Sequence, residues 1–143
     1  MLRGSNRTTA TAVSRSHPRM FVRMIIVTGA AGFIGSALVG ELLRQGWADI
    51  VAVDDFSHPD KAPNLEGKTL TARVDRMDFP SWLDANESRV QFIFHLGART
   101  DTTLFDKAVF DELNIRYSQH VWDRCVRYGI PLVYASSAAT YGD

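Results

Sequence analysis

Three glycines and one carboxylate are spaced in this sequence as phosphate and ribose binding require. Gly29, Gly32 and Gly35 lie in "TGAAGFIG", between a short apolar run and a helical pattern. A glycine turn that opens a helix sets free backbone amides and the positive end of the helix dipole against phosphates. Asp54 ends the next apolar run, where a carboxylate meets ribose hydroxyls. The order strand, glycines, helix, strand and acid predicts a dinucleotide site.

Each glycine has its own expected task. Gly29 permits the tight turn, Gly32 lets the backbone approach a pyrophosphate, and Gly35 lets the helix pack closely on the sheet. The alternative is that all three serve only turn and packing needs. A phosphate-loop nucleotidase is disfavoured, because no Gly-Lys-Ser/Thr follows the glycines.

A second group of polar residues ends the chain. An apolar run at 132–134 leads into Ser136 and Ser137 and then a small-residue turn, in "LVYASSAATYGD". Hydroxyls at the end of a buried strand are typical of the entrance to an active site.

The elements that must position these residues alternate between strand and helix. Strands are predicted at 24–29, 49–55, 68–75, 89–98 and 132–137, and helices at 33–46, 80–87 and 105–128. Short continuous apolar runs such as "MIIVTG" indicate strands that are buried on both faces. The alternation predicts an α/β fold, a Rossmann-like doubly wound parallel sheet of about five strands with right-handed crossovers.

Composition places these elements in one domain with a basic leader. The 143 residues have zero formal net charge, but residues 1–23 contain five arginines and no acid. We expect 1–23 to be a disordered leader and 24–143 the folded domain. Three origins of this leader are open. It results from a start codon assigned too far upstream, or it is a genuine tail or an organelle-targeting segment. Residues 1–20 have no aromatic residue among their arginines, so they do not indicate nucleic-acid binding.

The expected compartment follows from two features that the sequence lacks, a membrane-spanning apolar run and a second cysteine. No apolar run approaches the roughly 20 residues that span a bilayer, and a single cysteine excludes an internal disulfide, which fits a reducing compartment. We therefore expect a cytoplasmic protein without membrane or nucleic-acid partners and without a metal site.

The spacing G-x-x-G-x-x-G resembles the extended short-chain dehydrogenase/reductase family, in particular its NAD-dependent nucleotide-sugar epimerases and dehydratases. "FHLGA" at 94–98 and "YASSAATYG" at 134–142 are similar to the fourth- and fifth-strand motifs of this family. The segments "GARTDTT" and "SSAATYG" most resemble the branch that epimerises ADP-heptose. The resemblance covers residues 24–143, implies a nucleotide-sugar substrate, and implies that the full-length protein is a homo-oligomer.

The resemblance implies a set of cofactor contacts. The pyrophosphate would meet the glycines and their neighbours, the ribose the acids after the second strand, and the adenine an acid after the third strand. The nicotinamide half would meet the loop after the fourth strand, and an asparagine on the long helix would brace the site. These residues are Gly29, Gly32, Phe33, Ile34, Gly35, Asp54, Asp55, Lys61, Asp75, Arg76, Leu96, Gly97, Ala98, Arg99, Thr100 and Asn114.

The choice between NADP and NAD depends on three of these residues. Lys61 and Arg76 lie where the resembling branch places cations that reach a 2′-phosphate, which favours NADP. Asp54 alone favours NAD, because a carboxylate repels that phosphate. We expect NADP, with NAD as the alternative; ordinary surface charge is the other interpretation of the two cations.

The same resemblance implies the catalytic and substrate residues. Ser137 would be catalytic and would bond the substrate hydroxyl or carbonyl, and Ser136 and Ala138 would lie beside the sugar. Thr102 and Thr103 would touch substrate phosphate or sugar, or cap the following helix.

Hydride chemistry on a sugar carbinol also needs a base. In the family this base is a tyrosine with a lysine four residues later, and this sequence contains no Tyr-x-x-x-Lys. We therefore expect a truncated piece, lacking the C-terminal part and the substrate domain, that is inactive alone. The alternatives are another epimerase or dehydratase of the family, or a non-catalytic dinucleotide-binding module.

Two residues with reactive side chains are assigned to the core. His95 lies in the middle of an apolar run, which is typical of a satisfied core histidine rather than an acid–base catalyst. Cys125 lies on the apolar face of the predicted helix at 105–128, as expected of core packing.

Overall fold

The computed structural model describes residues 23–97 and 107–136, with the backbone alone for 107–113. Within them one sheet forms from β1 (Met24–Thr28), β2 (Ile50–Asp54), β3 (Ala72–Asp75), β4 (Val90–His95) and β5 (Leu132–Tyr134). Neighbouring strands are parallel, in the order β3-β2-β1-β4-β5. This order confirms the predicted Rossmann-like sheet, and it reverses between β1 and β4, the position where such sheets bind ligands.

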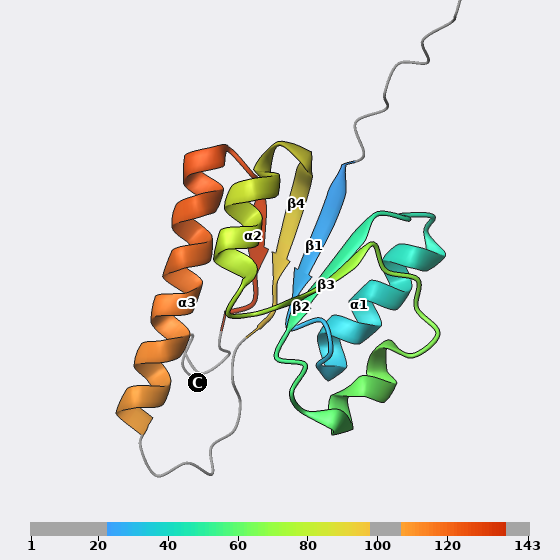
Figure 1. The fold of residues 1–143 in the computed structure, drawn as a ribbon, viewed down its shortest axis with the longest axis horizontal. Helices are drawn as coiled ribbons and strands as arrows, with labels where there is room; N and C mark the ends of the chain where they lie inside the picture. The colour runs from blue at the N-terminus through green and yellow to red at the C-terminus, as the bar shows by residue number, and fades with distance from the viewer. Residues whose placement is uncertain (1–22, 98–106, 137–143) are drawn as a thin grey trace, which may run out of the picture.

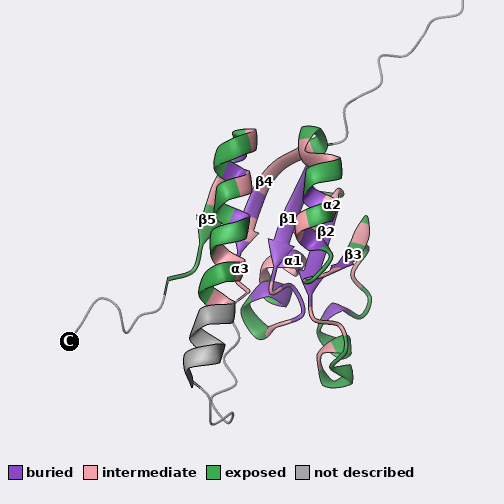
Figure 2. Ribbon diagram, turned by 60° about the vertical axis from the view of Figure 1, so that its left-hand side comes forward, coloured by how far each residue is buried: buried purple, intermediate pink, exposed green. Residues whose placement is uncertain are grey.

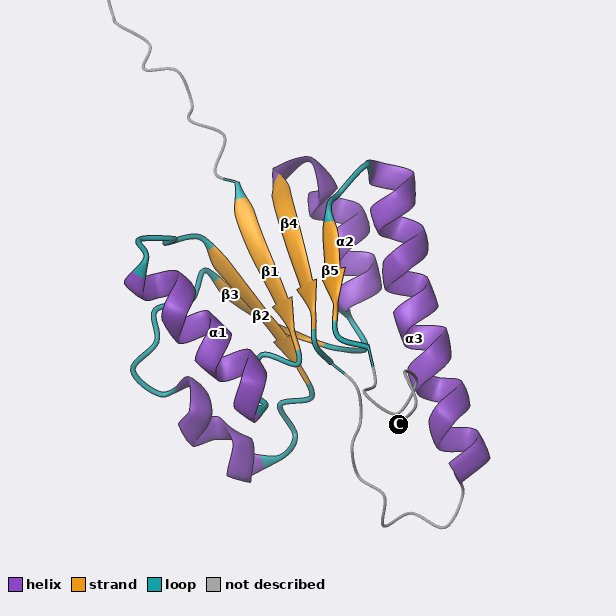
Figure 3. Ribbon diagram, turned by 180° about the vertical axis from the view of Figure 1, so that it is seen from behind, coloured by secondary structure: helices purple, strands orange, loops and turns teal. Residues whose placement is uncertain are grey.

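Helices cover both faces of the sheet. α1 (Phe33–Arg44) and the 3-10 helix η1 (Pro59–Leu65) lie on one face. α2 (Phe79–Asn86), the 3-10 turn η2 (Glu87–Arg89) and α3 (Lys107–Tyr128) follow on the other side (Figures 1 and 3). The sheet is therefore the middle of three layers.

The core is divided between the two faces because strand side chains alternate. Met24 and Ile26 of β1 belong to the cluster under α2 and α3, while Ile25 and Val27 belong to the cluster under α1. Every residue of β1 and β2 is buried, whereas the outer surface of α3 is largely exposed (Figure 2). Each fully buried aliphatic side chain stabilises the fold by roughly 1.5–3 kcal/mol, so these two strands anchor the domain.

Several boundaries differ from those predicted. Residues 59–65 form η1, which was not expected; it begins at Pro59, where a missing amide costs nothing. β3 covers only 72–75, because the polar residues before it form a loop in which the Thr71 amide donates to Ile50 O at 2.8 Å. β5 ends at Tyr134 rather than at 137.

β5 lies at the edge of the sheet, as expected, and is poorly covered. Val133 and Tyr134 are 48% and 55% exposed, and Trp122 of α3 packs edge-on against the Tyr134 ring with centroids 6.0 Å apart. In the part of the chain that the structure describes, no helix is long and apolar enough to cross a bilayer. Residues 1–22 of the predicted leader lie outside the described residues.

Candidate dinucleotide-binding site

The glycine turn after β1 is packed so closely that side chains are excluded. Gly29 has φ +69°, and a Cβ there would lie 2.8 Å from Gly97 Cα and N. A Cβ on Gly35 would lie 2.0 Å from Gly29 O, well inside contact distance. Gly29 therefore makes the tight turn predicted for it, whereas Gly35 lets α1 pack against the backbone of that turn and not against the sheet itself. The crowding also brings the start of α1 and the loop after β4 against one turn.

The start of α1 leaves its first amides available. Gly32 is the N-cap and has no side chain to cap them, and the first helical hydrogen bond runs from Ser36 N to Gly32 O at 2.9 Å. The amides of Phe33, Ile34 and Gly35 precede that bond. The side chains of Phe33 and Ile34 are 89% and 68% exposed. An uncapped helix start with this dipole is suited to bind an anion.

Asp54 at the end of β2 holds the glycine turn in place. Its carboxylate is 7% exposed, and Oδ2 accepts a hydrogen bond from Ala31 N at 2.8 Å. Oδ1 accepts from Asp55 N at 2.8 Å and from Lys61 Nζ at 3.0 Å. The charge of Asp54 is thus compensated by an ammonium and two amides, as a buried carboxylate requires. This residue joins the glycine turn to the end of β2, where the ribose is predicted to lie.

The two cations predicted to reach a 2′-phosphate contact different partners. Lys61 is ion-paired to Asp54, whereas the Arg76 guanidinium lies 4.8 Å from the centre of the Tyr117 ring. The Tyr117 hydroxyl is buried without a hydrogen-bond partner among the described residues, and burial raises its pKa. Lys61 is therefore the cation placed at the Asp54 carboxylate.

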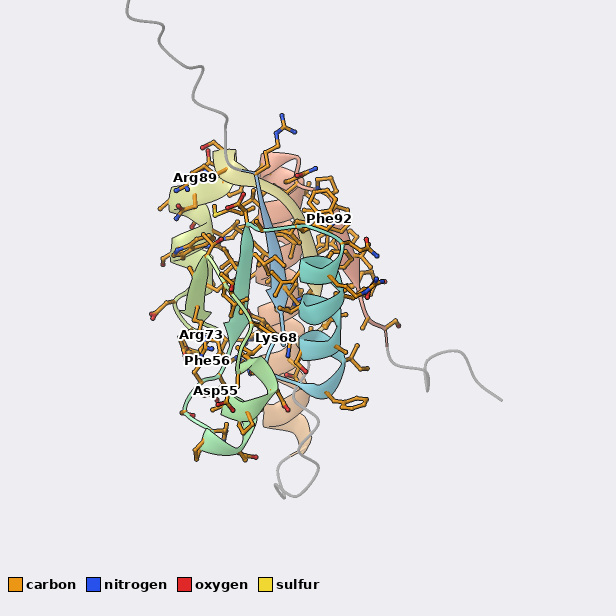
Figure 4. The ribbon with its side chains drawn as sticks, turned by 90° about the vertical axis from the view of Figure 1, so that its right-hand side faces the viewer. Asp55, Phe56, Lys68, Arg73, Arg89 and Phe92 are labelled. Atoms are coloured by element: carbon orange, nitrogen blue, oxygen red, sulfur yellow. The ribbon has the colours of Figure 1, made fainter. Side chains whose placement is uncertain are left out.

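The other two acids predicted to contact the adenosine half form local turns. Asp55 accepts from Ser57 Oγ at 2.5 Å and Ser57 N at 3.1 Å, which lowers the pKa of its carboxyl. Asp75 Oδ1 accepts from Met77 N at 2.9 Å. Figure 4 shows Asp55 and Phe56 beside η1, at the end of the sheet opposite to Arg89 and Phe92. Both acids thus flank the carboxyl edge, where their side chains order the adjoining loops.

His95 connects the turn to α3. It is 6% exposed; Nδ1 lies 2.7 Å from Thr28 Oγ1 and Nε2 lies 2.9 Å from Ser118 Oγ. Burial, and then the charge of Arg76, lowers its pKa to about 4. Both ring nitrogens are used, which confirms the prediction of a satisfied core histidine. Cys125 is 4% exposed, and burial raises its pKa to about 11, in keeping with its predicted core role.

The remaining predicted residues are distributed as follows. Leu96 donates its amide to Thr28 O at 3.2 Å, and Gly97 donates its amide to Thr28 Oγ1 at 3.2 Å. Ser136 is exposed just beyond β5, and Asn114 is half-buried on α3. Seven positions lie outside the described residues: Ala98, Arg99, Thr100, Thr102, Thr103, Ser137 and Ala138. The predicted catalytic serine is among these seven.

Sequence reasoning missed two residues that shape the turn. Thr28 uses its hydroxyl to join β1 to β4, through His95 and Gly97. Asn64 in η1 donates its side-chain amide to Ala31 O at 2.8 Å. Contacts of this kind join residues more than 30 positions apart and leave no local pattern. Among the described residues, no group of histidine, cysteine or acidic side chains could hold a metal ion.

Comparison with known families identifies the type of domain. Residues 25–143 match the model of the NAD dependent epimerase/dehydratase family. The chain belongs to this family. Membership accounts for the combination of an uncapped helix start, crowded glycines and an acid at the end of β2.

Two curated relatives within the epimerase/dehydratase family narrow the comparison. The chain is 44% identical over 121 residues to an ADP-L-glycero-D-manno-heptose-6-epimerase of Alkalilimnicola ehrlichii. It is 46% identical over 120 residues to the protein of that name from Cupriavidus pinatubonensis. Both alignments cover 83% of this chain, but only 38% and 36% of the relatives. The chain therefore spans less than two fifths of their length.

Solved structures agree on the fold of the epimerase/dehydratase domain. UDP-glucuronic acid 4-epimerase from Bacillus cereus, in complex with NAD, gives a TM-score of 0.67 at 26% identity, over 84% of this chain and 42% of that one. The ADP-L-glycero-D-manno-heptose-6-epimerase of Helicobacter pylori gives 0.66 at 22% identity, over 86% and 42%. At this level of identity the second comparison supports the fold alone.

Proposed function

We propose that residues 24–143 form the cofactor-binding part of a nucleotide-sugar epimerase that acts at C6 of ADP-heptose and uses NADP. The observation that carries the cofactor site is the uncapped start of α1, held against the glycine turn that Asp54 braces. The substrate assignment is supported by relatives of 44% and 46% identity that bear the heptose epimerase name. The unmatched length of those relatives makes activity a property of a longer protein.

The residues of the turn fit a dinucleotide. The amides of Phe33 and Ile34 would hold the pyrophosphate, and Asp54 would meet the ribose from the end of β2. When bound, the nicotinamide supplies a hydride acceptor and donor, so that one carbon is oxidised and then reduced on its opposite face. The close approach of Gly29 to Gly97 keeps side chains out of the space between the ends of β1 and β4, where the dinucleotide would pass.

Proton transfer needs residues that this chain only begins to supply. Ser137 would bond the reacting hydroxyl, and the exposed Ser136 would lie beside the sugar. The tyrosine and lysine that would hold and move the proton are absent from the sequence, which has no Tyr-x-x-x-Lys. We therefore expect the 143-residue chain to bind dinucleotide weakly and to turn over no ADP-heptose.

The Asp54–Lys61 pair supports NADP. Asp54 alone would repel a 2′-phosphate, but the Lys61 ammonium 3.0 Å from Oδ1 offsets its charge. Because Lys61 is 37% exposed and its ammonium has three N–H donors, one donor can reach a phosphate while another stays on Asp54. Arg76, stacked on Tyr117, is less directly placed for this contact.

Titration of the 143-residue chain with NADPH and NADH, followed by amide NMR shifts, tests both parts of the proposal. We expect the Phe33 and Ile34 amides to shift and NADPH to bind more tightly. The Lys61→Gln variant should weaken NADPH roughly tenfold while changing NADH less than twofold, because a charged hydrogen bond to phosphate is lost. Arg44→Gln, which removes an exposed ion pair on α1, is the matched control.

The outcomes of this titration test the existence of the cofactor site separately from its preference for NADP. No shift with either dinucleotide at millimolar concentration would remove the proposed function altogether. If NADPH and NADH bind with equal affinity and Lys61→Gln alters neither, the cofactor site is retained but the preference for NADP is overturned. Epimerisation of ADP-heptose by the chain alone would contradict the assignment of the base to a longer protein.

A further inference from the structure

The 3-10 helix η1 contacts the glycine turn through Asn64 and the end of β2 through Lys61. Leu65, 1% exposed, anchors η1 in the core cluster under α1. Lys61 then reaches the Asp54 carboxylate, and Asn64 reaches the carbonyl of Ala31. Lys68, labelled in Figure 4, donates from Nζ to the backbone carbonyl of Asn64 at 2.6 Å. The segment 59–68 is thus attached both to the turn and to the core, through the neighbouring residues Asn64 and Leu65.

Ala31 is held on both sides of its α-carbon. Its amide donates to Asp54 Oδ2 at 2.8 Å, and its carbonyl accepts from Asn64 Nδ2 at 2.8 Å. Ala31 is 1% exposed, so water does not replace either partner readily. The two bonds fix the peptide planes before and after this residue. The second of these planes leads directly into Gly32, the N-cap of α1.

Orientation of that peptide decides where the first amides of α1 point. Gly32 has extended backbone, φ −74° and ψ 171°, and lacks a side chain to restrain it. Its amide bonds Gly29 O at 3.1 Å, a contact inside the turn itself. Restraint from outside the turn comes from Asp54, on the sheet, and Asn64, on η1. Preorganised amides bind anions without the cost of ordering at the moment of binding.

We propose that Asn64 is a positioning residue for pyrophosphate binding, acting through the Ala31 carbonyl on the amides at the start of α1. The inference rests on the proposed dinucleotide site and deepens it. Asn64 does not touch the ligand; it fixes the turn that does. Its effect is therefore confined to ligands that carry a pyrophosphate.

Two adenosine ligands make this distinction measurable on the 143-residue chain. ADP-ribose contains the pyrophosphate, whereas 2′-AMP contains only adenine, ribose and a 2′-phosphate. Asn64→Ala should weaken ADP-ribose about tenfold, as expected when a buried carbonyl loses its donor, and 2′-AMP less than twofold. If Asn64 only stabilised the fold, Asn64→Ala would weaken the binding of both ligands by the same factor, because less of the protein would be folded.

Asn86→Ala is the matched control. The Asn86 side-chain amide donates to Trp82 O at 2.8 Å on α2. This bond has the same donor and acceptor groups and the same length as the Asn64–Ala31 bond, but it lies on the opposite face of the sheet. Removing it should leave both affinities unchanged. If Asn64→Ala lowers the two affinities equally, or lowers neither, the positioning role is overturned. If the wild-type chain binds neither ligand, the proposed function fails first.

A measurement on the wild-type chain tests the proposal even if the variant fails to fold. The side-chain amide protons of Asn64 should exchange with solvent more slowly when ADP-ribose is bound, and at an unchanged rate with 2′-AMP. Protection by both ligands to the same degree, or by neither, would overturn the inference.

A second variant, Asn64→Leu, keeps most of the side-chain volume without a donor. It should reproduce the selective loss of affinity for ADP-ribose.

Discussion

The glycine turn and the β5 edge lie on one sheet but are built in opposite ways. At the turn, buried polar groups are partnered and backbone atoms touch backbone atoms, as between Gly29 and Gly97. At the edge, Val133 and Tyr134 are about half exposed and Trp122 is 51% exposed. The turn is complete within the described residues, whereas the edge presents an apolar surface and unpaired strand backbone. Ligand binding and association are therefore expected to reside in different regions.

The comparison predicts its largest effect at Gly35. Gly35→Ala would place a Cβ 2.0 Å from Gly29 O, where no flexible side chain can yield, so we expect a loss of about 3 kcal/mol in the free energy of unfolding. Urea unfolding monitored by circular dichroism measures it. On the same helix, Gly40→Ala meets only the end of Lys68 at 3.4 Å and should be neutral or stabilising by about 1 kcal/mol. Similar values for the two variants would show that the turn is not crowded.

His95 joins the two regions and gives the turn a pH dependence. Its folded-state pKa, about 4, lies below the ordinary 6.5. The unfolded chain therefore takes up this proton first as pH falls. The contribution of neutral His95 is fully present above pH 6.5 and declines to about pH 4, by about 3 kcal/mol in all. The free energy of unfolding, followed across that window, should fall more steeply for the wild type than for His95→Gln.

His58 provides the control for this slope. It is exposed, and its ring contacts Asp55 only at 3.6 Å. His58→Gln should keep the wild-type pH dependence, since the carboxylates that titrate in the same window are common to all three proteins. A slope that stays unaltered in His95→Gln would mean that the ring is not held neutral by its surroundings.

The smallest expected effect is at the β5 edge. Val133→Lys puts a charge on an exposed edge strand, which hinders strand-to-strand association. Sedimentation should show less self-association, while the free energy of unfolding changes by less than about 0.5 kcal/mol. Met77→Lys, at a 77% exposed residue that follows β3 at the opposite end of the sheet from β5, should reduce association less. A wild-type chain that sediments as a clean monomer would contradict the premise.

The two regions also differ in how far the sequence predicts them. β1 and β2 were predictable because a strand buried on both faces needs a continuous apolar run, and the glycine pattern fixes a local turn. η1 was not, because its only local signals are two prolines and its contacts are long-range. Asn64 and Thr28 were missed for the same reason: a side-chain bond to a distant backbone has no period. Asp54 was assigned to ribose, and its bond to Ala31 adds a bracing role that only the folded geometry shows.

The contact between Gly29 and Gly97 limits how this domain can be diversified. A Cβ at either position meets the backbone of the other, at 2.8 Å in one direction and 3.0 Å in the reverse. Relief would require moving a whole loop, so enlarging one position cannot be compensated by shrinking the other, which is already a glycine. In a saturation library the pair should therefore stay invariant, while the exposed Phe33 and Ile34 a few residues away accept many replacements.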